Sequence, residues 1–217
     1  MKTNTGTSRL APSVTVWLLI ATLAPALSGC FGAAVVGVGA GALMVADRRI
    51  SETYLADEGI EIRAANRIGE KFGSNTHVNV TSYNRMVLLT GEAPDATAKA
   101  EAEKVVAGVP NVKAVTNELQ VAGASSLGGR SNDTYITSKV KARFIDYGKF
   151  SPHLVKVVTE AGTVYLLGLV TQREADDAVD IARTTSGVLK VVRVFEIIGG
   201  EDARRADPSA PEKVPVK

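Results

Sequence analysis

The chain has 217 residues, with 25 lysines and arginines against 23 aspartates and glutamates, and aromatic residues make up 5% of it. Nearly balanced charge and few aromatics exclude a typical nucleic-acid-binding protein, which needs a basic surface. Its single cysteine, Cys30, excludes a disulfide-bonded fold.

Residues 1–29 have the parts of a secretory signal peptide. Lys2 and Arg9 make a basic start, an apolar stretch follows, and small residues stand directly before Cys30. Cleavage there would remove two positive charges and leave 23 basic and 23 acidic side chains, so total charge predicts no partner.

The run Leu-Ser-Gly-Cys that ends at Cys30 resembles the lipobox of bacterial lipoproteins. That resemblance implies cleavage before Cys30, a diacylglyceryl group on its thiol, and an acylated amino end, with palmitate-type chains. Several acyl chains together anchor a protein stably. Phe31 follows where an inner-membrane lipoprotein would have aspartate, which implies the periplasmic face of the outer membrane. The alternatives for Cys30 are a buried small side chain or the end of a membrane-spanning helix.

Residues 30–52 are predicted to be a lipidated tether. The glycine- and alanine-rich run 31–46 is shorter than a membrane-spanning helix. Residues 34–42 also fit a GxGxxA pattern, but no βαβ unit follows, so a dinucleotide site is not favoured.

The remainder of the chain is a repeat. The run 87–91 matches the run 164–168 at a spacing of 77, and each run ends in a glycine. Downstream the spacing is 76, so one residue is missing after the glycine of the second copy. This pattern predicts two copies of one small domain, 53–122 and 132–199, with a linker at 123–131 and a disordered tail at 200–217.

Each copy is expected to have the order helix, strand, strand, helix, strand. The first helix of each copy carries a buried face at i, i+4 spacing: Ile60, Ala64, Ile68 and Phe72, then Ile136, Val140 and Phe144. Asp95 or Thr97 is expected to begin the second helix of copy one, and Thr171 with Glu174 forms a capping box in copy two. The fold class is therefore α+β, an α/β sandwich with two helices on a three-stranded mixed sheet in each copy. Because each core is small, the two copies are expected to pack together.

This doubled unit behind a lipobox resembles the tandem BON-domain lipoproteins. The most specific segments are SNDTYITSKVKARF, VTEAGTVYLLGLVTQREADDAVDIA and SGVLKVVRVF. The resemblance implies an outer-membrane lipoprotein with two BON domains and no enzymatic activity or cofactor. It also implies that the second domain binds anionic phospholipid of the phosphatidylglycerol type. A role in membrane integrity under envelope stress, and at the division site, goes with the family.

The first helix of copy two is the predicted lipid contact. Tyr135, Lys139 and Arg143 form a stripe at i, i+4 spacing beside the buried row. An interfacial aromatic followed by long basic side chains suits a membrane surface. The predicted phospholipid-binding residues are Tyr135, Ile136, Ser138, Lys139, Val140 and Arg143, the apolar ones either supporting the helix or entering the lipid. The alternative is an ordinary solvated helix face with Tyr135 half in the core.

No catalytic or metal motif is recognised. His77 and His153 occupy near-equivalent places at the entrance to a strand, without carboxylates at metal-ligand spacing, so surface turns in separate domains are expected. The competing function is a lipid-tethered scaffold whose partners are envelope assembly or division proteins. Such a scaffold would use a sheet edge or an apolar patch. The sequence does not predict the oligomeric state.

Overall fold

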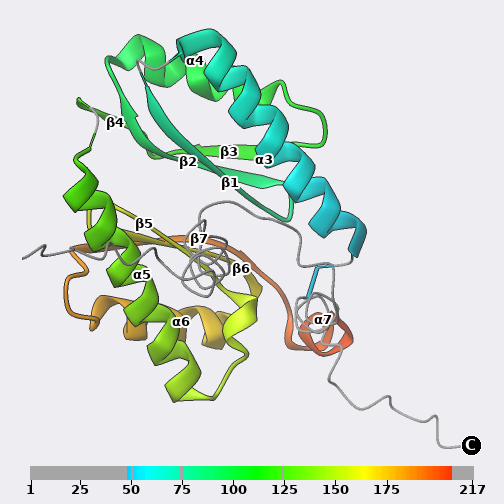
Figure 1. The fold of residues 1–217 in the computed structure, drawn as a ribbon. Coiled ribbons are helices and arrows are strands. Elements are labelled where there is room, and N and C mark those ends of the chain that lie inside the picture. The colour runs from blue at the N-terminus through cyan, green and yellow to red at the C-terminus, as the bar shows by residue number, and fades with distance from the viewer. Residues whose placement is uncertain (1–47, 50, 74–75, 124, 207–217) are drawn as a thin grey trace, which may run out of the picture. The chain divides into compact units, whose positions relative to one another are not determined.

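The computed structural model describes residues 48–49, 51–73, 76–123 and 125–206 (Figure 1). The first domain comprises α3 (Ser51–Phe72), β1 (His77–Tyr83), β2 (Met86–Ala93), α4 (Ala96–Ala107), β3 (Ala114–Asn117) and β4 (Gln120–Val121). Strand β2 is central: β1 pairs with it antiparallel, and β3 and β4 pair with it parallel, one after the other. The single closing strand expected from sequence is thus divided into two segments.

The second domain repeats this order. It comprises α5 (Leu127–Tyr147), a 3₁₀ turn η3 (Pro152–Leu154), β5 (Lys156–Glu160), β6 (Thr163–Val170), α6 (Gln172–Arg183) and β7 (Lys190–Ile197). Strand β6 is central, antiparallel to β5 and parallel to β7. Two helices and one small mixed sheet in each copy confirm the predicted α+β class.

The helix starts follow from their capping residues. The Asp95 side chain accepts a hydrogen bond from the Ala98 N–H and begins α4. Thr171 and Glu174 form the predicted capping box of α6, with the Glu174 carboxylate accepting from the Thr171 N–H at 2.8 Å. One residue fewer separates the central strand's glycine from the cap in the second copy, as the change in repeat spacing indicates.

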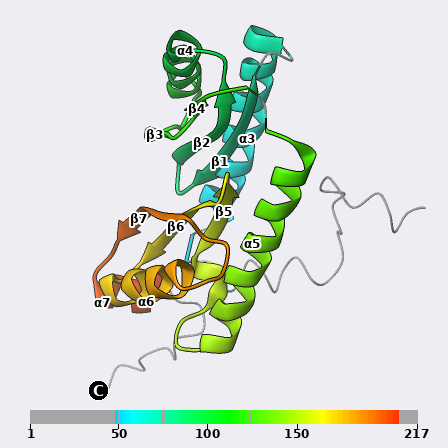
Figure 2. The same cartoon turned by 90° about the vertical axis from the view of Figure 1, so that its left-hand side faces the viewer.

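The sheets of the two domains pack against each other through their faces away from the helices. Tyr83 and Leu88 of the first sheet share a buried cluster with Tyr165 and Leu167 of the second. Figures 1 and 2 show the sheets side by side, with α3 and α4 beyond one and α6 beyond the other. The expectation that two small cores pack together is confirmed, because each sheet buries its second apolar face against its neighbour.

Polar contacts cross the same boundary. Lys156 Nζ lies 2.8 Å from Glu61 Oε1, and the Asn79 amide donates to Glu160 Oε2 at 2.9 Å. The Asn84 amide also donates to Glu196 Oε2 at 2.6 Å. The interface between domains therefore has an apolar centre and hydrogen-bonded edges.

An aspartate in the first helix of each domain holds the hairpin turn beneath it. Asn84 and Arg85 of the β1–β2 turn have φ of 51° and 66°, and Asp57 accepts hydrogen bonds from both of their N–H groups at 2.8 and 2.7 Å. Asp133 does the same for Ala161 and Gly162, at 2.9 and 2.8 Å. Non-glycine residues at positive φ are unfavourable, so these carboxylates stabilise conformations the turns would otherwise resist.

The glycine that recurs in the central strands is explained by close backbone approach. A Cβ on Gly91 would lie 2.0 Å from the His77 carbonyl oxygen, and one on Gly168 would lie 2.4 Å from the Leu154 carbonyl oxygen. Gly91 also has φ of +108°. Both positions exclude any side chain, because the neighbouring backbone occupies the space.

Two predicted boundaries need correction. The linker was predicted at 123–131, but α5 begins at Leu127, because Ser126 caps it by accepting from the Gly129 N–H. The tail at 200–217 was expected to be disordered, but residues 200–206 form helix α7, with Ala203 buried. Acidic residues in its first turn and basic residues in its last turn favour that short helix. The predicted signal peptide, Cys30 and nearly all of the tether lie outside the described residues.

Among the described residues, no helix is both long enough and apolar enough to cross a membrane. Arg48, just before α3, contacts the second domain: its guanidinium makes two hydrogen bonds to the Glu174 carboxylate and one to the Leu169 carbonyl. The segment directly before the first domain is thus bound to the second domain.

Candidate functional site

The predicted contact helix, α5, is held by its buried row. Ile136, Val140 and Phe144 have no solvent-exposed surface and belong to the core of the second domain. Ile136 and Val140 therefore support the helix and do not enter lipid, because exposing them would require opening the core. Of the two roles considered for the apolar members, the structure supports the first.

Tyr135 lies on the outside of α5 with 62% of its surface exposed. The Lys139 ammonium lies 4.6 Å from the centre of the Tyr135 ring and also donates to the Ser186 carbonyl. Tyr135 is therefore not half in the core, and a cation–π contact with Lys139 holds its ring on the helix surface. Tyr135 and Lys139 form one unit on the surface.

Arg143, the third member of the predicted stripe, has a structural role. Its Nη1 donates to the Ile181 carbonyl and to Thr185 Oγ1, both at 2.8 Å, at the carboxyl end of α6. A cation there also complements the helix dipole. Arg67, the equivalent residue 76 positions earlier, donates to the Gly108 carbonyl at the end of α4. Because both domains use this arginine in the same way, it connects their two helices.

Three backbone segments meet at the amino-terminal half of α5. Asp133 binds the β5–β6 turn, and a Cβ on Gly187 of the α6–β7 loop would lie 3.2 Å from the Ile136 side chain. The Leu189 N–H in that loop donates to the Gly162 carbonyl at 2.9 Å. We call this end of the second domain, formed by the start of α5, the β5–β6 turn and the α6–β7 loop, the tip.

The tip presents apolar side chains with basic neighbours. Leu189 is 81% exposed there, and Lys190 beside it is exposed too. Tyr135 and Lys139 stand on the same tip from α5. Leu189 was not predicted from the sequence, because it follows Val188 directly and its run resembles the start of the apolar closing strand.

Ser138 and Lys141 lie on the opposite flank of α5 from Lys139. Both line a cleft between the two domains, and Ser138 is exposed, with its hydroxyl donating to the Thr134 carbonyl at 3.0 Å. Ser138 therefore does not share a surface with Arg143, and the six predicted residues divide among three places: the tip, the core and the flanks.

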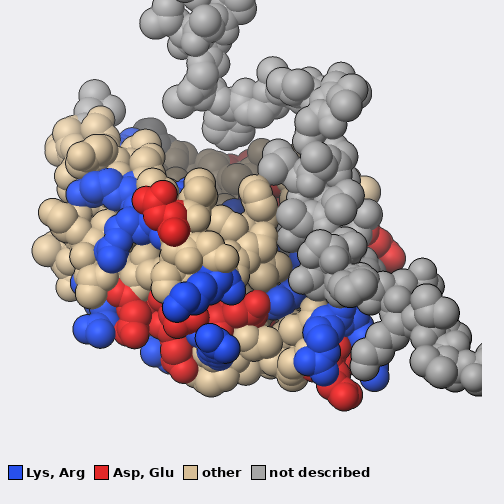
Figure 3. All heavy atoms as spheres, turned by 90° about the horizontal axis from the view of Figure 1, so that it is seen from below, with Lys and Arg blue, Asp and Glu red and all other residues tan. Residues whose placement is uncertain are grey.

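The side of the molecule that carries α6 does not present a uniform basic surface. Figure 3 shows acidic and basic side chains interspersed there, the acidic ones gathered toward the middle. On α6, Asp176 and Asp180 form ion pairs with Arg193 and Arg183. Neutralised in this way, that side offers little attraction to an anionic surface.

The first domain lacks the features of the tip. Gly59 stands where the second domain has Tyr135, and Arg63 stands where it has Lys139, by the 76-residue spacing. The aromatic ring is thus specific to the second domain, whereas the structural arginine and the turn-holding aspartate are common to both.

The prediction for His77 was partly right. His77 begins β1, at the entrance to a strand as predicted, but it is not in a surface turn, and its Nδ1 lies 3.0 Å from Glu92 Oε2. Glu160 of the second domain lies nearby, so His77 does not serve one domain alone. His153 is exposed in the η3 turn, as expected.

Comparisons with known proteins agree with the repeat. A model of the BON domain matches residues 60–123 and 132–199. The chain is 40% identical over 175 residues to a Haemophilus influenzae protein named outer membrane lipoprotein DolP, covering 79% of this chain and 90% of the relative. It is 32% identical over 154 residues to a 21 kDa hemolysin of Actinobacillus pleuropneumoniae, covering 70% and 79%.

Among solved structures, one of CdsD, a structural protein of the type III secretion system of Chlamydia trachomatis, covers 73% of this chain and 99% of its own. With a TM-score of 0.27 and 13% identity, that likeness bears on neither fold nor function here.

Proposed function

Since the chain belongs to the BON-domain family, we propose that it is an outer-membrane lipoprotein, anchored through Cys30 on the periplasmic face, whose second BON domain binds anionic phospholipid. The family and its relatives are non-enzymatic, and the chain is not an enzyme. Through this contact the protein would support outer-membrane integrity, including at the division site.

The observation that carries the proposal is the exposed Tyr135 ring with Lys139 over it, on a tip that also exposes Leu189. Tyrosine has an apolar ring and a polar hydroxyl, which suits it to the headgroup level of a bilayer. The lysine ammonium next to it can pair with a lipid phosphate. The residues proposed for the contact are therefore Tyr135, Lys139, Leu189 and Lys190, and Arg143 holds the helix in place.

The expected strength of this contact is modest. A basic side chain near an anionic surface contributes about 1 kcal/mol, and burying a leucine fully contributes about 2 kcal/mol. The two lysines and the leucine alone give about 4 kcal/mol, which corresponds to a dissociation constant of roughly 1 mM, and the Tyr135 ring adds to this. Such a contact orients a protein that acyl chains already hold, and does not anchor it alone.

A second candidate function is a lipid-tethered scaffold for envelope assembly or division proteins. The observation in its favour is that Leu55 and Ile62, seven residues apart on α3, are both exposed. Residues seven apart lie on one helix face, so the two make a short apolar stripe on the first domain.

Vesicle binding separates the two functions. A soluble form beginning at residue 48, without the anchor, should cosediment with vesicles containing phosphatidylglycerol and not with neutral phosphatidylcholine vesicles. Tyr135→Ala and Lys139→Ala should each weaken binding, and added salt should weaken it further. The matched control is Arg63→Ala, at the position equivalent to Lys139 in the first domain, which should leave binding unchanged. Equal binding by Lys139→Ala and Arg63→Ala would reject the tip as the contact.

A further inference from the structure

Three metal-ligating side chains meet where the two domains join. His77 begins β1, Glu92 lies opposite it on β2, and Glu160 ends β5 of the second domain. The His77 ring nitrogen and one oxygen from each carboxylate all lie within 4.8 Å of one another. The interaction at 3.0 Å between His77 Nδ1 and Glu92 Oε2 already joins two of them.

Both carboxylates of this group are buried. Glu92 and Glu160 are only 7% and 6% exposed, and buried carboxylates are costly without a compensating cation. Glu160 accepts a hydrogen bond from the neutral amide of Asn79, at 2.9 Å.

The guanidinium of Arg130 is partly used by another contact. Arg130 lines the same cleft, but its Nε and Nη2 donate to the hydroxyl and the carbonyl of Ser125, at 3.1 and 3.3 Å. Asp133 is likewise used by the β5–β6 turn. The cluster therefore joins two buried carboxylates to one imidazole.

We propose that His77, Glu92 and Glu160 bind one divalent transition metal ion, with Zn²⁺ the best match. An imidazole nitrogen with two carboxylate oxygens suits Zn²⁺, whereas Mg²⁺ and Ca²⁺ prefer oxygen ligands alone. Bonds of about 2.1 Å place tetrahedral ligand atoms about 3.4 Å apart. The His77 and Glu92 ligand atoms are 3.0 Å apart, and the Glu160 oxygen lies within 4.8 Å of both.

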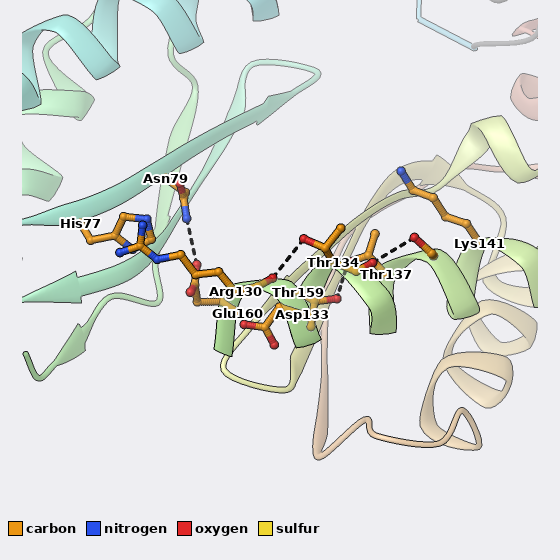
Figure 4. Close-up of a pocket in the computed structure, with 10 residues that line it drawn as sticks. His77, Asn79, Arg130, Asp133, Thr134, Thr137, Lys141, Thr159 and Glu160 are labelled. Atoms are coloured by element: carbon orange, nitrogen blue, oxygen red, sulfur yellow. Dashed lines mark hydrogen bonds between the residues drawn. The ribbon is translucent and has the colours of Figure 1, made fainter. Parts of the chain in front are cut away.

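A path to solvent exists on one side. A cleft of about 430 Å³ reaches His77 and Glu160 and is lined by Thr134, Thr137 and Thr159 (Figure 4). Water from this cleft supplies the fourth ligand. Because residue 91 is a glycine, no Cβ crowds the imidazole: a Cβ at this position would lie 3.4 Å from His77 Nδ1.

A metal at this place would link the domains. Two ligands belong to the first sheet and one to the second, so the ion fixes the arrangement that the apolar interface only favours. This inference does not depend on lipid binding, since none of the three ligands lies on the tip.

The test uses the natively processed full chain, extracted from membranes in detergent. Calorimetric titration with zinc chloride should show one ion per chain, and magnesium chloride should show no comparable binding. His77→Ala and Glu160→Gln should weaken zinc binding at least tenfold, as loss of a ligand or its support does. His153→Ala, which removes the other histidine, should bind as the wild type does.

A second measurement keeps the test independent of variant folding. X-ray absorption at the zinc edge of the wild-type protein should show one imidazole and oxygen ligands, without sulfur. Zinc that binds no more tightly than magnesium would overturn the proposal. So would unchanged affinity in Glu160→Gln, or a sulfur ligand, which none of the three proposed residues can provide.

Discussion

The turn-holding aspartates allow a quantitative prediction. Asp57 is 2% exposed and accepts four hydrogen bonds, at 2.7–2.8 Å, from the following donors: Ser82 Oγ, the N–H groups of Asn84 and Arg85, and Arg49 Nη1. In Asp57→Asn, an NH₂ group replaces one acceptor oxygen in either orientation. Two bonds are then lost, and a backbone N–H faces another donor.

Hydrogen bonds to a charged group are worth about 1.5–3 kcal/mol each, so the loss of two in Asp57→Asn should lower the free energy of unfolding by about 3–6 kcal/mol. Asp133 has two such bonds to the β5–β6 turn, so Asp133→Asn should cost about half as much.

Urea unfolding followed by circular dichroism, on the form beginning at residue 48, measures both changes. Asp146→Asn, at an exposed position of α5, is the control and should change stability by less than about 0.5 kcal/mol. A loss below about 1 kcal/mol in Asp57→Asn would refute the claim that the carboxylate holds the turn.

Three further predictions concern stability. Gly91→Ala should lower the free energy of unfolding by more than about 2 kcal/mol, because the new Cβ would overlap the His77 carbonyl oxygen. Gly69→Ala, on α3, should raise it by about 0.5–1 kcal/mol in the same urea assay, because no atom lies within 4 Å of the new Cβ. Arg143→Ala should lower the thermal midpoint without any lipid present, since it leaves the end of α6 without its donor; an unchanged midpoint would return Arg143 to the lipid contact. The third prediction concerns Arg48→Ala. In the wild-type protein burial raises the pKa of Glu174, but the hydrogen bonds from Arg48 and Thr171 outweigh burial and lower the pKa overall. The difference in free energy of unfolding between Arg48→Ala and the wild type should therefore be largest above about pH 4.3 and should decrease as the pH falls further. A difference of equal size at pH 3 and pH 6 would contradict this.

The sequence was sufficient for the domain repeat and its fold. Apolar positions at helical and strand spacing occur twice with one offset, and periodicity of this kind depends only on which face is buried. The two capping predictions succeeded for a similar reason: Asp95 and the pair Thr171–Glu174 act within one turn of their own helix.

The candidate site was only partly predictable, because its contacts join distant elements. Periodicity placed Tyr135 outside and Ile136 inside. It could not show that Arg143 donates a hydrogen bond to the carbonyl of Ile181, 38 residues later in the chain. Aligning the copies offers a signal: Arg67 and Arg143 match, which indicates a structural role in both. The cluster of His77, Glu92 and Glu160 crosses two domains, and no spacing within one copy reveals it.

The most direct test of the membrane proposal uses one tryptophan as a probe of depth. The only tryptophan of the chain is Trp17, so the form beginning at residue 48 has none. Tyr135→Trp places the probe on the tip, and Leu55→Trp places it on the exposed face of α3 as a matched control. With vesicles containing phosphatidylglycerol, the emission of Tyr135→Trp should shift to shorter wavelength, and that of Leu55→Trp should not. A shift in Leu55→Trp alone, or in neither protein, would contradict binding through the second domain.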